Sequence, residues 1–451
     1  MSLLVIDWAV VGIKAGQLIL CLSILVVLHE MGHFLPAKWF KCRVEKFYLF
    51  FDPWFSLVKK KVGETEYGIG WLPLGGYVKI AGMIDESMDK EQLKQPAQSW
   101  EFRSKPAWQR LIIMIGGVTV NLLLGFLIFA MVLFTWGEEY LPVKNVTQGV
   151  FVDSLGMKVG LQDGDKILGV NGKEIDNFEK IPGEIILGEG KSLQIERNNQ
   201  RMELAIPEGI IRSLIRKKGE RLAYPKFPAI IDSVDQKIAK FKEGILQKGD
   251  EIIGFDDKPV RSYAELTYLK KSYVNKEVPV RVVRGKDTAT IRLMVDKDSR
   301  LGIIVKPMTD FIQFKKREYG FFESLPAGVR KGWSTLVMNI QNFKLLFTSK
   351  EVKASESLGS FISIGGMFGA QWDWERFWSM TALLSIVLAF MNILPIPALD
   401  GGHVIFTLYE MITGRKPGEK FMEYAQIVGM VLLLGLMAYA LGLDVFRLFK
   451  A

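Results

Sequence analysis

Three ionisable side chains of the types that bind metals lie close together near the start of the chain. His29, Glu30 and His33 form the pattern His-Glu-x-x-His in the segment HEMGH. On a helix, two histidines four residues apart share one face and can bind zinc, while the glutamate can reach a metal-bound water. Zinc lowers the pKa of such a water to about 7, so the glutamate can act as the general base of a peptide hydrolysis.

The position of this motif is unusual, because it lies in an apolar segment at residues 15–36. Five residues with three fixed can arise by chance, and a pair of buried structural histidines in a helical bundle would give the same pattern. Ionisable groups are costly inside a bilayer, however, and usually mark function there. A metal site is therefore the interpretation that best explains the cluster.

A third ligand is expected, since catalytic zinc has three protein ligands and one open position. The segment NILPIPALDGGH, Asn392 to His403, offers the carboxylate of Asp400 and the only other histidine of the chain. Pro395 and Pro397 interrupt the helix at this point, which a membrane tolerates only where the backbone is otherwise satisfied or faces a polar cavity. A hydrolytic site needs such a cavity for water.

The elements that must position these residues are four apolar segments, at 15–36, 108–135, 377–397 and 425–443. Each is long enough, or nearly so, to span a bilayer. Lysine and arginine gather after the first segment, before the second, and between the third and fourth, so these loops are expected to be cytoplasmic. This orientation brings Asp400 to the depth of the two histidines of HEMGH.

The composition agrees with a membrane protein of several domains. The chain has 451 residues, 49% of them hydrophobic, and the apolar residues are clustered. A net charge of +9 could indicate nucleic acid as a partner, but the basic residues are dispersed and several flank the apolar segments. We therefore interpret the charge as a sign of membrane topology, with the lipid bilayer and no nucleic acid as partner.

The region between the second and third apolar segments contains an internal repeat. LQDGDKILGVNGKEI begins at Leu161, and LQKGDEIIGFDDKPV begins 85 residues later, at Leu246. Each copy has a Gly-Asp turn, an apolar β-type run and a second turn, and each is followed by a short helix and another strand. The pattern resembles bacterial PDZ domains, which can bind a peptide as an added strand. A pair of spacer or gating domains without a ligand fits equally well.

A further helix is predicted after the repeats, because apolar residues recur there every three or four positions. It has two possible environments, the outer membrane surface or the repeat domains. The apolar face consists of Phe322, Leu325, Val329, Trp333, Leu336, Ile340, Phe343 and Phe347.

Taken together, HEMGH in the first span, NILPIPALDGGH at the end of the third and PDZ-like repeats between spans two and three resemble the site-2 protease family of intramembrane zinc metalloproteases. The similarity is greatest to its bacterial members of the regulator of sigma-E protease type. It covers essentially the whole chain, and the paired motifs in this order are highly specific.

The resemblance implies roles for individual residues. His29, His33 and Asp400 would be the zinc ligands and Glu30 the general base, while His403 would be left outside the ligand set. Asn392 would help to hold the substrate backbone, and Pro395 and Pro397 belong to the same motif and are expected to border the substrate.

The stretch WLPLGGYVKIAGM, Trp71 to Met83, resembles the re-entrant β-hairpin of the family, with Gly75 and Gly76 at its turn. The resemblance implies that this hairpin pairs with the unwound substrate as an extra strand. A plain surface hairpin is the alternative that the glycines alone leave open.

Two stretches depart from the family pattern. Gly116 to Asn121, GGVTVN, lies where relatives often have Gly-Pro before the asparagine, and Phe361 stands where relatives often have proline. We expect neither stretch to touch the zinc site.

We therefore predict a polytopic α-helical membrane protein of four transmembrane helices, with two β-rich PDZ-like domains inserted between helices 2 and 3. The predicted domains are 1–136 with the first two spans, 137–215 and 216–307 as PDZ-like domains, 308–376 as amphipathic helix and connector, and 377–451 with the last two spans. The protein is expected in a bacterial inner membrane, with the PDZ-like domains outside the cytoplasm and the zinc site near the cytoplasmic side.

The predicted activity is cleavage of single-span membrane proteins, such as anti-sigma factors and remnant signal peptides, with zinc as cofactor. Three alternatives remain: a PDZ scaffold with a vestigial zinc site, an unrelated membrane metalloprotease, and a channel or transporter that uses intramembrane ionisable groups. A scaffold has no need of Glu30, and the unrelated proteases lack the LDGGH motif and the repeats.

Overall fold

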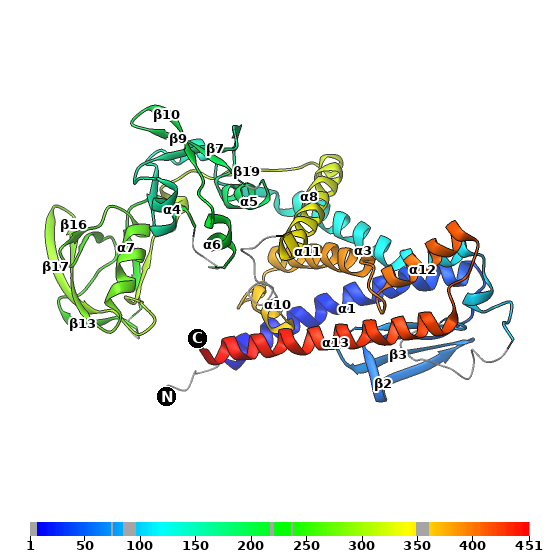
Figure 1. The fold of residues 1–451 in the computed structure, drawn as a ribbon. Helices are drawn as coiled ribbons and strands as arrows, with labels where there is room; N and C mark the ends of the chain where they lie inside the picture. Colours follow the sequence, from blue (N-terminus) through cyan, green and yellow to red (C-terminus); the bar gives the residue numbers. More distant parts are fainter. Residues whose placement is uncertain are drawn as a thin grey trace. The chain divides into compact units, whose positions relative to one another are not determined.

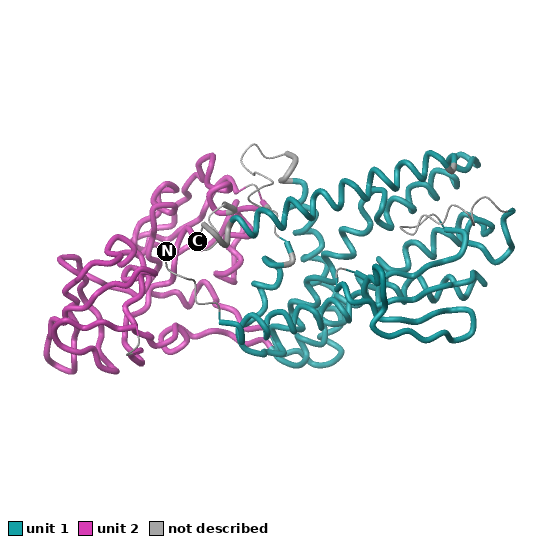
Figure 2. The backbone as a smooth tube through the Cα atoms, turned by 90° about the horizontal axis from the view of Figure 1, so that it is seen from below, with its two compact units in different colours: residues 1–137, 318–348, 354–451 teal, residues 138–317, 349–353 magenta. Residues whose placement is uncertain are grey.

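The computed structural model describes residues 7–73, 75–83, 96–188, 190–216, 221–235, 238–348 and 360–450. The chain divides into two compact units, which Figure 2 shows in different colours. The first consists of residues 1–137, 318–348 and 354–451, and the second of residues 138–317 and 349–353. All four apolar spans belong to the first unit.

The described residues include four helices that are long and apolar enough to cross a membrane. They are α1 (Trp8–Trp39), α3 (Ala107–Trp136), α11 (Trp374–Ile393) and the segment Lys420–Phe446 of α13 (Glu419–Lys450) (Figure 1). The four predicted spans are therefore confirmed as helices, mostly with longer bounds. The third is an exception at its end: α11 stops at Ile393 and not at residue 397, because Pro395 and Pro397 cannot continue it.

Small residues let the spanning helices approach closely. A Cβ added at Gly32 of α1 would lie 2.5 Å from the carbonyl oxygen of Gly116 on α3. A Cβ added at Gly125 of α3 would lie 2.6 Å from Cδ1 of Ile386 on α11. Such contacts are typical of helices that pack in a membrane, where backbones meet across small side chains. They bring α1 and α11 against the same helix, α3.

A four-stranded sheet follows α1 in the first unit. Its strands are β1 (Val44–Leu49), β2 (Phe51–Val62), β3 (Thr65–Leu72) and β4 (Tyr77–Ile80), in the spatial order β2-β3-β1-β4. Residues 71–72 end β3 and residues 77–80 form β4, and β1 lies between them, parallel to β3 and antiparallel to β4. The predicted β-hairpin at Trp71–Met83 is therefore wrong: the two strands are not paired with each other. β4 is an edge strand.

The predicted amphipathic helix is α8 (Phe321–Thr348), which packs on α3. The contact uses small residues, since a Cβ at Gly328 would lie 2.5 Å from the backbone nitrogen of Ala130, and one at Gly332 would lie 2.3 Å from the ring of Phe126. Much of the large apolar face, including Phe322 and Trp333, is exposed. In the first unit α8 thus packs on α3 and also on α11, and the environment of the exposed part of its apolar face stays a prediction.

The first unit also contains two shorter α-helices. They are α10 (Phe361–Met367) and α12 (Asp400–Thr413), and α12 follows α11 after a short loop. Since α12 begins at Asp400, its first residue is the carboxylate predicted as a metal ligand.

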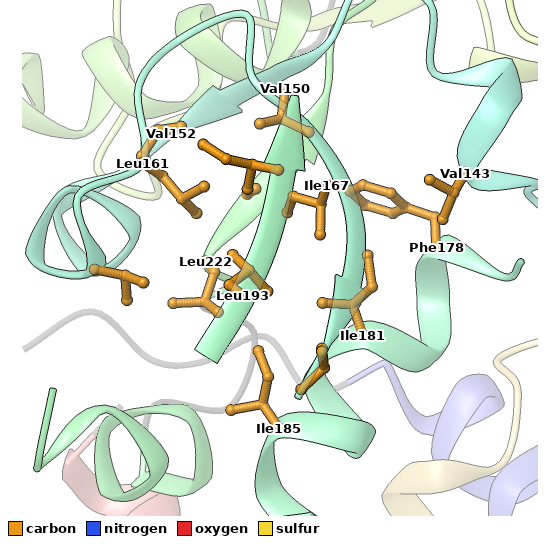
Figure 3. Close-up of a cluster of buried hydrophobic side chains, with 14 of the residues drawn as sticks. Val143, Val150, Val152, Leu161, Ile167, Phe178, Ile181, Ile185, Leu193 and Leu222 are labelled. Carbon is orange, nitrogen blue, oxygen red and sulfur yellow. The ribbon is translucent and has the colours of Figure 1, made fainter. Parts of the chain in front are cut away.

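The second unit contains two β-rich modules built from the repeat. The first has a core of buried aliphatic side chains, including Val150, Ile167 and Leu193, which point toward one another in Figure 3. The elements of the first module and the strand before it are β5 (Glu138–Tyr140), β6 (Val150–Val152), α4 (Ser154–Val159), β7 (Lys166–Val170), β8 (Lys173–Glu174), α5 (Ile181–Leu187), β9 (Ser192–Arg197), β10 (Gln200–Ala205), α6 (Ile210–Arg216) and β11 (Ala223–Pro225).

The second module repeats most of this order, with the strand β13 (Lys240–Glu243) where the first has the helix α4, and it has its own buried core around Phe255. Its elements and the strand after it are β12 (Ile231–Val234), β13 (Lys240–Glu243), β14 (Glu251–Phe255), β15 (Lys258–Pro259), α7 (Tyr263–Leu269), β16 (Glu277–Arg284), β17 (Asp287–Met294), β18 (Ile303–Val305) and β19 (Lys315–Arg317). β14 and β15 stand in the second copy where β7 and β8 stand in the first, so the repeat in the sequence is also a repeat of structure.

The same ion pair stabilises both copies. The buried carboxylate of Asp165 accepts two hydrogen bonds of 2.8 Å from Arg197, and that of Asp250 accepts two of 2.7 Å from Arg284. Each aspartate belongs to the Gly-Asp turn of its copy. Bidentate pairs of this kind have strict geometry, which explains why both turns carry an aspartate.

One detail of each copy differs from the prediction. The stretch predicted as one strand after the short helix is a hairpin of two strands, β9–β10 in the first copy and β16–β17 in the second. Asn198 and Asn199 form the first turn with φ values of 51° and 62°. Two central residues with positive φ are typical of the tight turns of hairpins, and asparagine adopts this conformation readily.

Candidate metal centre

His29, His33 and Asp400 form the one group of three or more potential metal ligands found among the described residues. Nε2 of His29 and Nε2 of His33 each lie 3.3 Å from Oδ2 of Asp400, and the two nitrogens lie 3.3 Å from each other. The histidines are one turn apart on α1, and Asp400 is the first residue of α12. The sequence motifs HEMGH and LDGGH therefore meet in space.

The geometry of this triangle fits zinc. Ligand atoms about 2.0–2.2 Å from one tetrahedral centre lie about 3.3–3.6 Å apart, and the three distances here are all 3.3 Å. Oδ2 of Asp400 is buried, and no hydrogen bond with ordinary geometry reaches it from the described residues. Two imidazoles and one carboxylate are also a ligand set that zinc prefers, with one position left open.

The tautomer of His33 suits metal binding. Its Nδ1 donates a hydrogen bond of 2.8 Å to the carbonyl oxygen of Ile113 on α3. The proton therefore resides on Nδ1, and the lone pair of Nε2 faces His29 and Asp400. Metal-binding histidines are commonly oriented by such a partner of the second ring nitrogen.

Asn121 of α3 orients the ring of His29 in a similar way. This asparagine is fully buried, its amide lies 3.2 Å from Nδ1 of His29, and its backbone carbonyl accepts a hydrogen bond of 2.7 Å from Ser385. The side-chain amide can rotate by 180°, and Oδ1 otherwise has no partner among the described residues. With Oδ1 turned to the ring, Nδ1 of His29 donates to it, and Nε2 is free for a metal.

α3 also approaches the histidines with its backbone. A Cβ added at Gly117 would lie 2.3 Å from Nε2 of His33 and 2.6 Å from Cε1 of His29, so no other residue fits without displacing a ring. The expectation that the stretch Gly116–Asn121 does not touch the site is therefore wrong. Both Gly117 and Asn121 contact it, because this face of α3 packs directly on α1.

A cavity of about 640 Å³ opens beside the triangle. His29, Glu30, His33 and Asp400 all line it, so the predicted general base faces the same space as the predicted ligands. The lining also includes charged and polar residues from the sheet, which makes the cavity suitable for water. These are Lys46, Asp52, Tyr77 and Lys79.

Of the residues predicted to contact the substrate, Asn392 and Gly76 lie at the site and the other three do not line the cavity. Nδ2 of Asn392 lies 3.3 Å from Nε2 of His29, and Gly76 lines the cavity beside β4. A Cβ at Gly76 would lie 2.6 Å from the carbonyl oxygen of Tyr48, so glycine is required there. Gly75, Pro395 and Pro397 are not in the described wall of the cavity. Gly75 lies instead against Phe51, with a φ of +154°.

The loop before Asp400 is folded back on itself by two glycines. A Cβ at Gly401 would lie 2.1 Å from the carbonyl oxygen of Leu394, and one at Gly402 would lie 2.8 Å from Cα of Pro397. The Gly-Gly pair after Asp400 is therefore required for α12 to start tightly against the loop. His403 follows on α12 and lines the same cavity, but it does not belong to the triangle of ligand atoms.

Several residues around the site were not identified from the sequence. The carbonyl of Ile113 has no sequence signal, because any residue supplies one. Asn121 and Gln426 did have a signal: each is a polar side chain inside an apolar segment, and such residues are expected to find polar partners. Gln426 of α13 lines the cavity and is buried.

Comparisons with known proteins identify the family of the chain. Peptidase family M50 matches residues 17–436. The chain is 27% identical to regulator of sigma-E protease RseP of Escherichia coli, over 96% of this chain and 98% of that protein. It is 26% identical to regulator of sigma E protease of Haemophilus influenzae, over 96% and 98%. A Thermotoga maritima protein assigned as a zinc metalloprotease is 26% identical, over 95% and 98%.

Proposed function

The chain belongs to peptidase family M50 and is a zinc metalloprotease of the site-2 type, and we propose that it cleaves single-span membrane proteins within or beside their transmembrane helix. The observation that carries the proposal is the meeting of His29, His33 and Asp400 beside a cavity that Glu30 also lines. These three residues would hold the zinc, and the cavity would admit substrate and water.

The chemistry follows from the groups in the cavity. Zinc, when bound, polarises the scissile carbonyl and lowers the pKa of a water to about 7. The carboxylate of Glu30 accepts the proton of the attacking water and then delivers it to the leaving nitrogen. Asn121 and the carbonyl of Ile113 keep both imidazole rings in the tautomer that leaves Nε2 free.

The substrate must be extended before it can react, since the peptide bonds of a helix are shielded by their own side chains and hydrogen bonds. β4 is an edge strand, and its residues Tyr77, Val78 and Lys79 line the cavity. An unwound segment of substrate can add to this edge through main-chain hydrogen bonds. The amide of Asn392, close to His29, would hold the backbone of that segment.

We further propose that the β-rich region acts as a gate. In this proposal the two β-rich modules are PDZ-like domains outside the cytoplasm, and the boundary between them lies after β11 and not at residue 215, because β11 pairs with β6 of the first module. Residues 308–376 form the amphipathic connector, and the zinc site lies near the cytoplasmic side of a bacterial inner membrane. The position of the repeat between α3 and α11 in the sequence supports this. The substrates would be anti-sigma factors already trimmed by another protease, and remnant signal peptides, admitted because they are short.

Purified protein in liposomes tests the activity. A trimmed single-span substrate should be cut, mass spectrometry should place the cut within or beside the transmembrane helix, and a zinc chelator should stop the reaction. Products cut only far from the membrane would refute intramembrane cleavage. For the gate, a variant lacking residues 145–300 should cleave untrimmed substrate that the full chain rejects, whereas unchanged discrimination would refute the gate and leave the protease activity intact.

A further inference from the structure

The residue two positions before Asp400 has an unusual backbone. Ala398 has a φ of +81°, in the left-handed region that residues with a Cβ rarely adopt. Such a conformation persists only where the surroundings hold it. Because Ala398 directs the chain from Pro397 into α12, its conformation sets where the carboxylate of Asp400 lies relative to the two histidines.

One polar side chain holds this residue. The backbone N–H of Ala398 donates a hydrogen bond of 3.1 Å to Oε1 of Gln426, which lies in the spanning segment of α13. Gln426 is only 6% exposed, although the residues around it in this segment are mostly apolar. A buried amide in an apolar helix is costly unless it is paired, and this hydrogen bond pairs it.

A second contact lies one turn further along the same face of α13. A Cβ added at Gly429 would lie 1.8 Å from the carbonyl oxygen of Pro397, so the helix backbone touches the loop directly. From the other side, Gly402 of α12 packs on Cα of Pro397. The turn Pro397–Ala398 is thus held between two helices, and only glycine allows the contact on either side.

We propose that Gln426 and Gly429 are positioning residues of the metal site: they hold the Pro397–Ala398 turn in the conformation that brings Asp400 to His29 and His33. α13 would thereby contribute to zinc binding without supplying a ligand. The inference rests on the proposed assignment of His29, His33 and Asp400 as zinc ligands. It predicts that zinc affinity depends on a side chain that the metal does not touch.

The test uses the full chain in detergent, with zinc affinity measured by competition with a chelator. Gln426→Leu keeps the volume and removes the acceptor, and it should lower zinc affinity about tenfold or more, as loss of an outer partner of a ligand does. Gly429→Ala should do the same. Gly435→Ala is the matched control on α13, because nothing lies within 4 Å of its added Cβ, and it should bind zinc like the wild type.

A rescue separates positioning from general loss of structure. Glycine adopts positive φ without help, so Ala398→Gly added to Gln426→Leu should recover a large part of the lost zinc affinity. Cobalt in place of zinc should give a weaker visible spectrum in Gln426→Leu than in the wild type, and the double variant should restore it. A variant that only unfolds the protein would not respond to this second change.

The outcomes are distinct. Wild-type zinc affinity and an unchanged cobalt spectrum in Gln426→Leu would overturn the proposal. A loss that Ala398→Gly does not rescue would also overturn it, because the defect would then lie elsewhere. If Gly429→Ala fails to fold, Gln426→Leu with and without Ala398→Gly still tests the proposal. Asp400→Asn is measured in parallel: unchanged zinc affinity in that variant would refute the ligand assignment itself, independently of Gln426.

Discussion

Nε2 of His33 lies 3.3 Å from Oδ2 of Asp400, although the two residues come from opposite ends of the chain. α1 carries the histidine, α12 carries the carboxylate, and α3 contacts both elements. The site therefore depends on how these three helices pack on one another.

Asp400→Asn should remove the charge of the third predicted ligand while keeping its size. A neutral amide oxygen is a poorer ligand for zinc than a carboxylate, so zinc affinity should fall about tenfold or more and cleavage should fall with it. Chelator competition and a peptide cleavage assay measure the two quantities. Asp257→Asn, at an exposed position of the second unit, is the control and should change neither.

Gly117→Ala should disturb both histidines, because the added Cβ would lie 2.3 Å from Nε2 of His33. We expect zinc affinity to fall about tenfold or more, since the rings must move out of the tetrahedral arrangement. Gly16→Ala on α1 is the matched control, with nothing within 4 Å of the new Cβ. Equal zinc affinity in the two variants would contradict the close packing of α3 on the site.

Asn121 is expected to accept a hydrogen bond from Nδ1 of His29, the ring nitrogen that does not face Asp400. Asn121→Leu removes the acceptor for the Nδ1 proton, and zinc affinity should fall about tenfold, as it does when such an outer partner is lost. Asn121→Asp keeps an acceptor and should bind zinc more tightly than Asn121→Leu. The reverse order would mean that Asn121 does not accept a hydrogen bond from His29.

The second unit should lose stability in acid through Asp250. Burial works to raise the pKa of this carboxyl, but the hydrogen bonds and charge of Arg284 and the backbone N–H of Gln247 outweigh it, and the pKa lies below its ordinary value. A depressed pKa contributes stability above the unfolded pKa of about 3.9, and this contribution is lost as the pH falls through the folded value. The protection of β14 and β16 against hydrogen exchange, after correction for the intrinsic pH dependence of amide exchange, should therefore decrease from pH 5 to pH 3.

Asp250→Ala is the matching variant. The carboxylate is buried but the side chain of Arg284 is 37% exposed, so water can solvate the guanidinium once its partner is removed. The main loss is the set of charge-assisted hydrogen bonds to Asp250, and the free energy of unfolding of this module should fall by about 1–2 kcal/mol at pH 7. The contribution of Asp250 to the acid loss should disappear in the variant. An identical acid response in the variant and the wild type would show that Asp250 is not its source.

The sequence was sufficient for the parts of the site with a fixed local geometry. His29 and His33 share a helix face because of their spacing. The charge pattern of the loops predicts that Asp400 lies at the same depth in the membrane as these histidines. The repeat was equally visible, since its turns and apolar runs recur with the same spacing. These features depend on residues that lie close in sequence or on rules for whole segments.

Contacts between distant segments could not be predicted in this way. Residues 71–83 look like a hairpin, but β1 takes the place between β3 and β4, and no local signal indicates this. The contact of Gly117 with the histidines depends on which face of α3 meets α1, and several faces of an apolar helix look alike. The carbonyl of Ile113 and the left-handed Ala398 are backbone features that side-chain patterns do not specify.

The most direct test compares the wild type with Glu30→Gln in liposomes that contain a trimmed single-span substrate, with bound zinc measured in both. Glu208→Gln, at an exposed position of the second unit, is the control and should cleave normally. We predict that Glu30→Gln keeps its zinc and loses cleavage, because the ligands remain and the base is gone. Normal cleavage by Glu30→Gln would contradict the proposed mechanism.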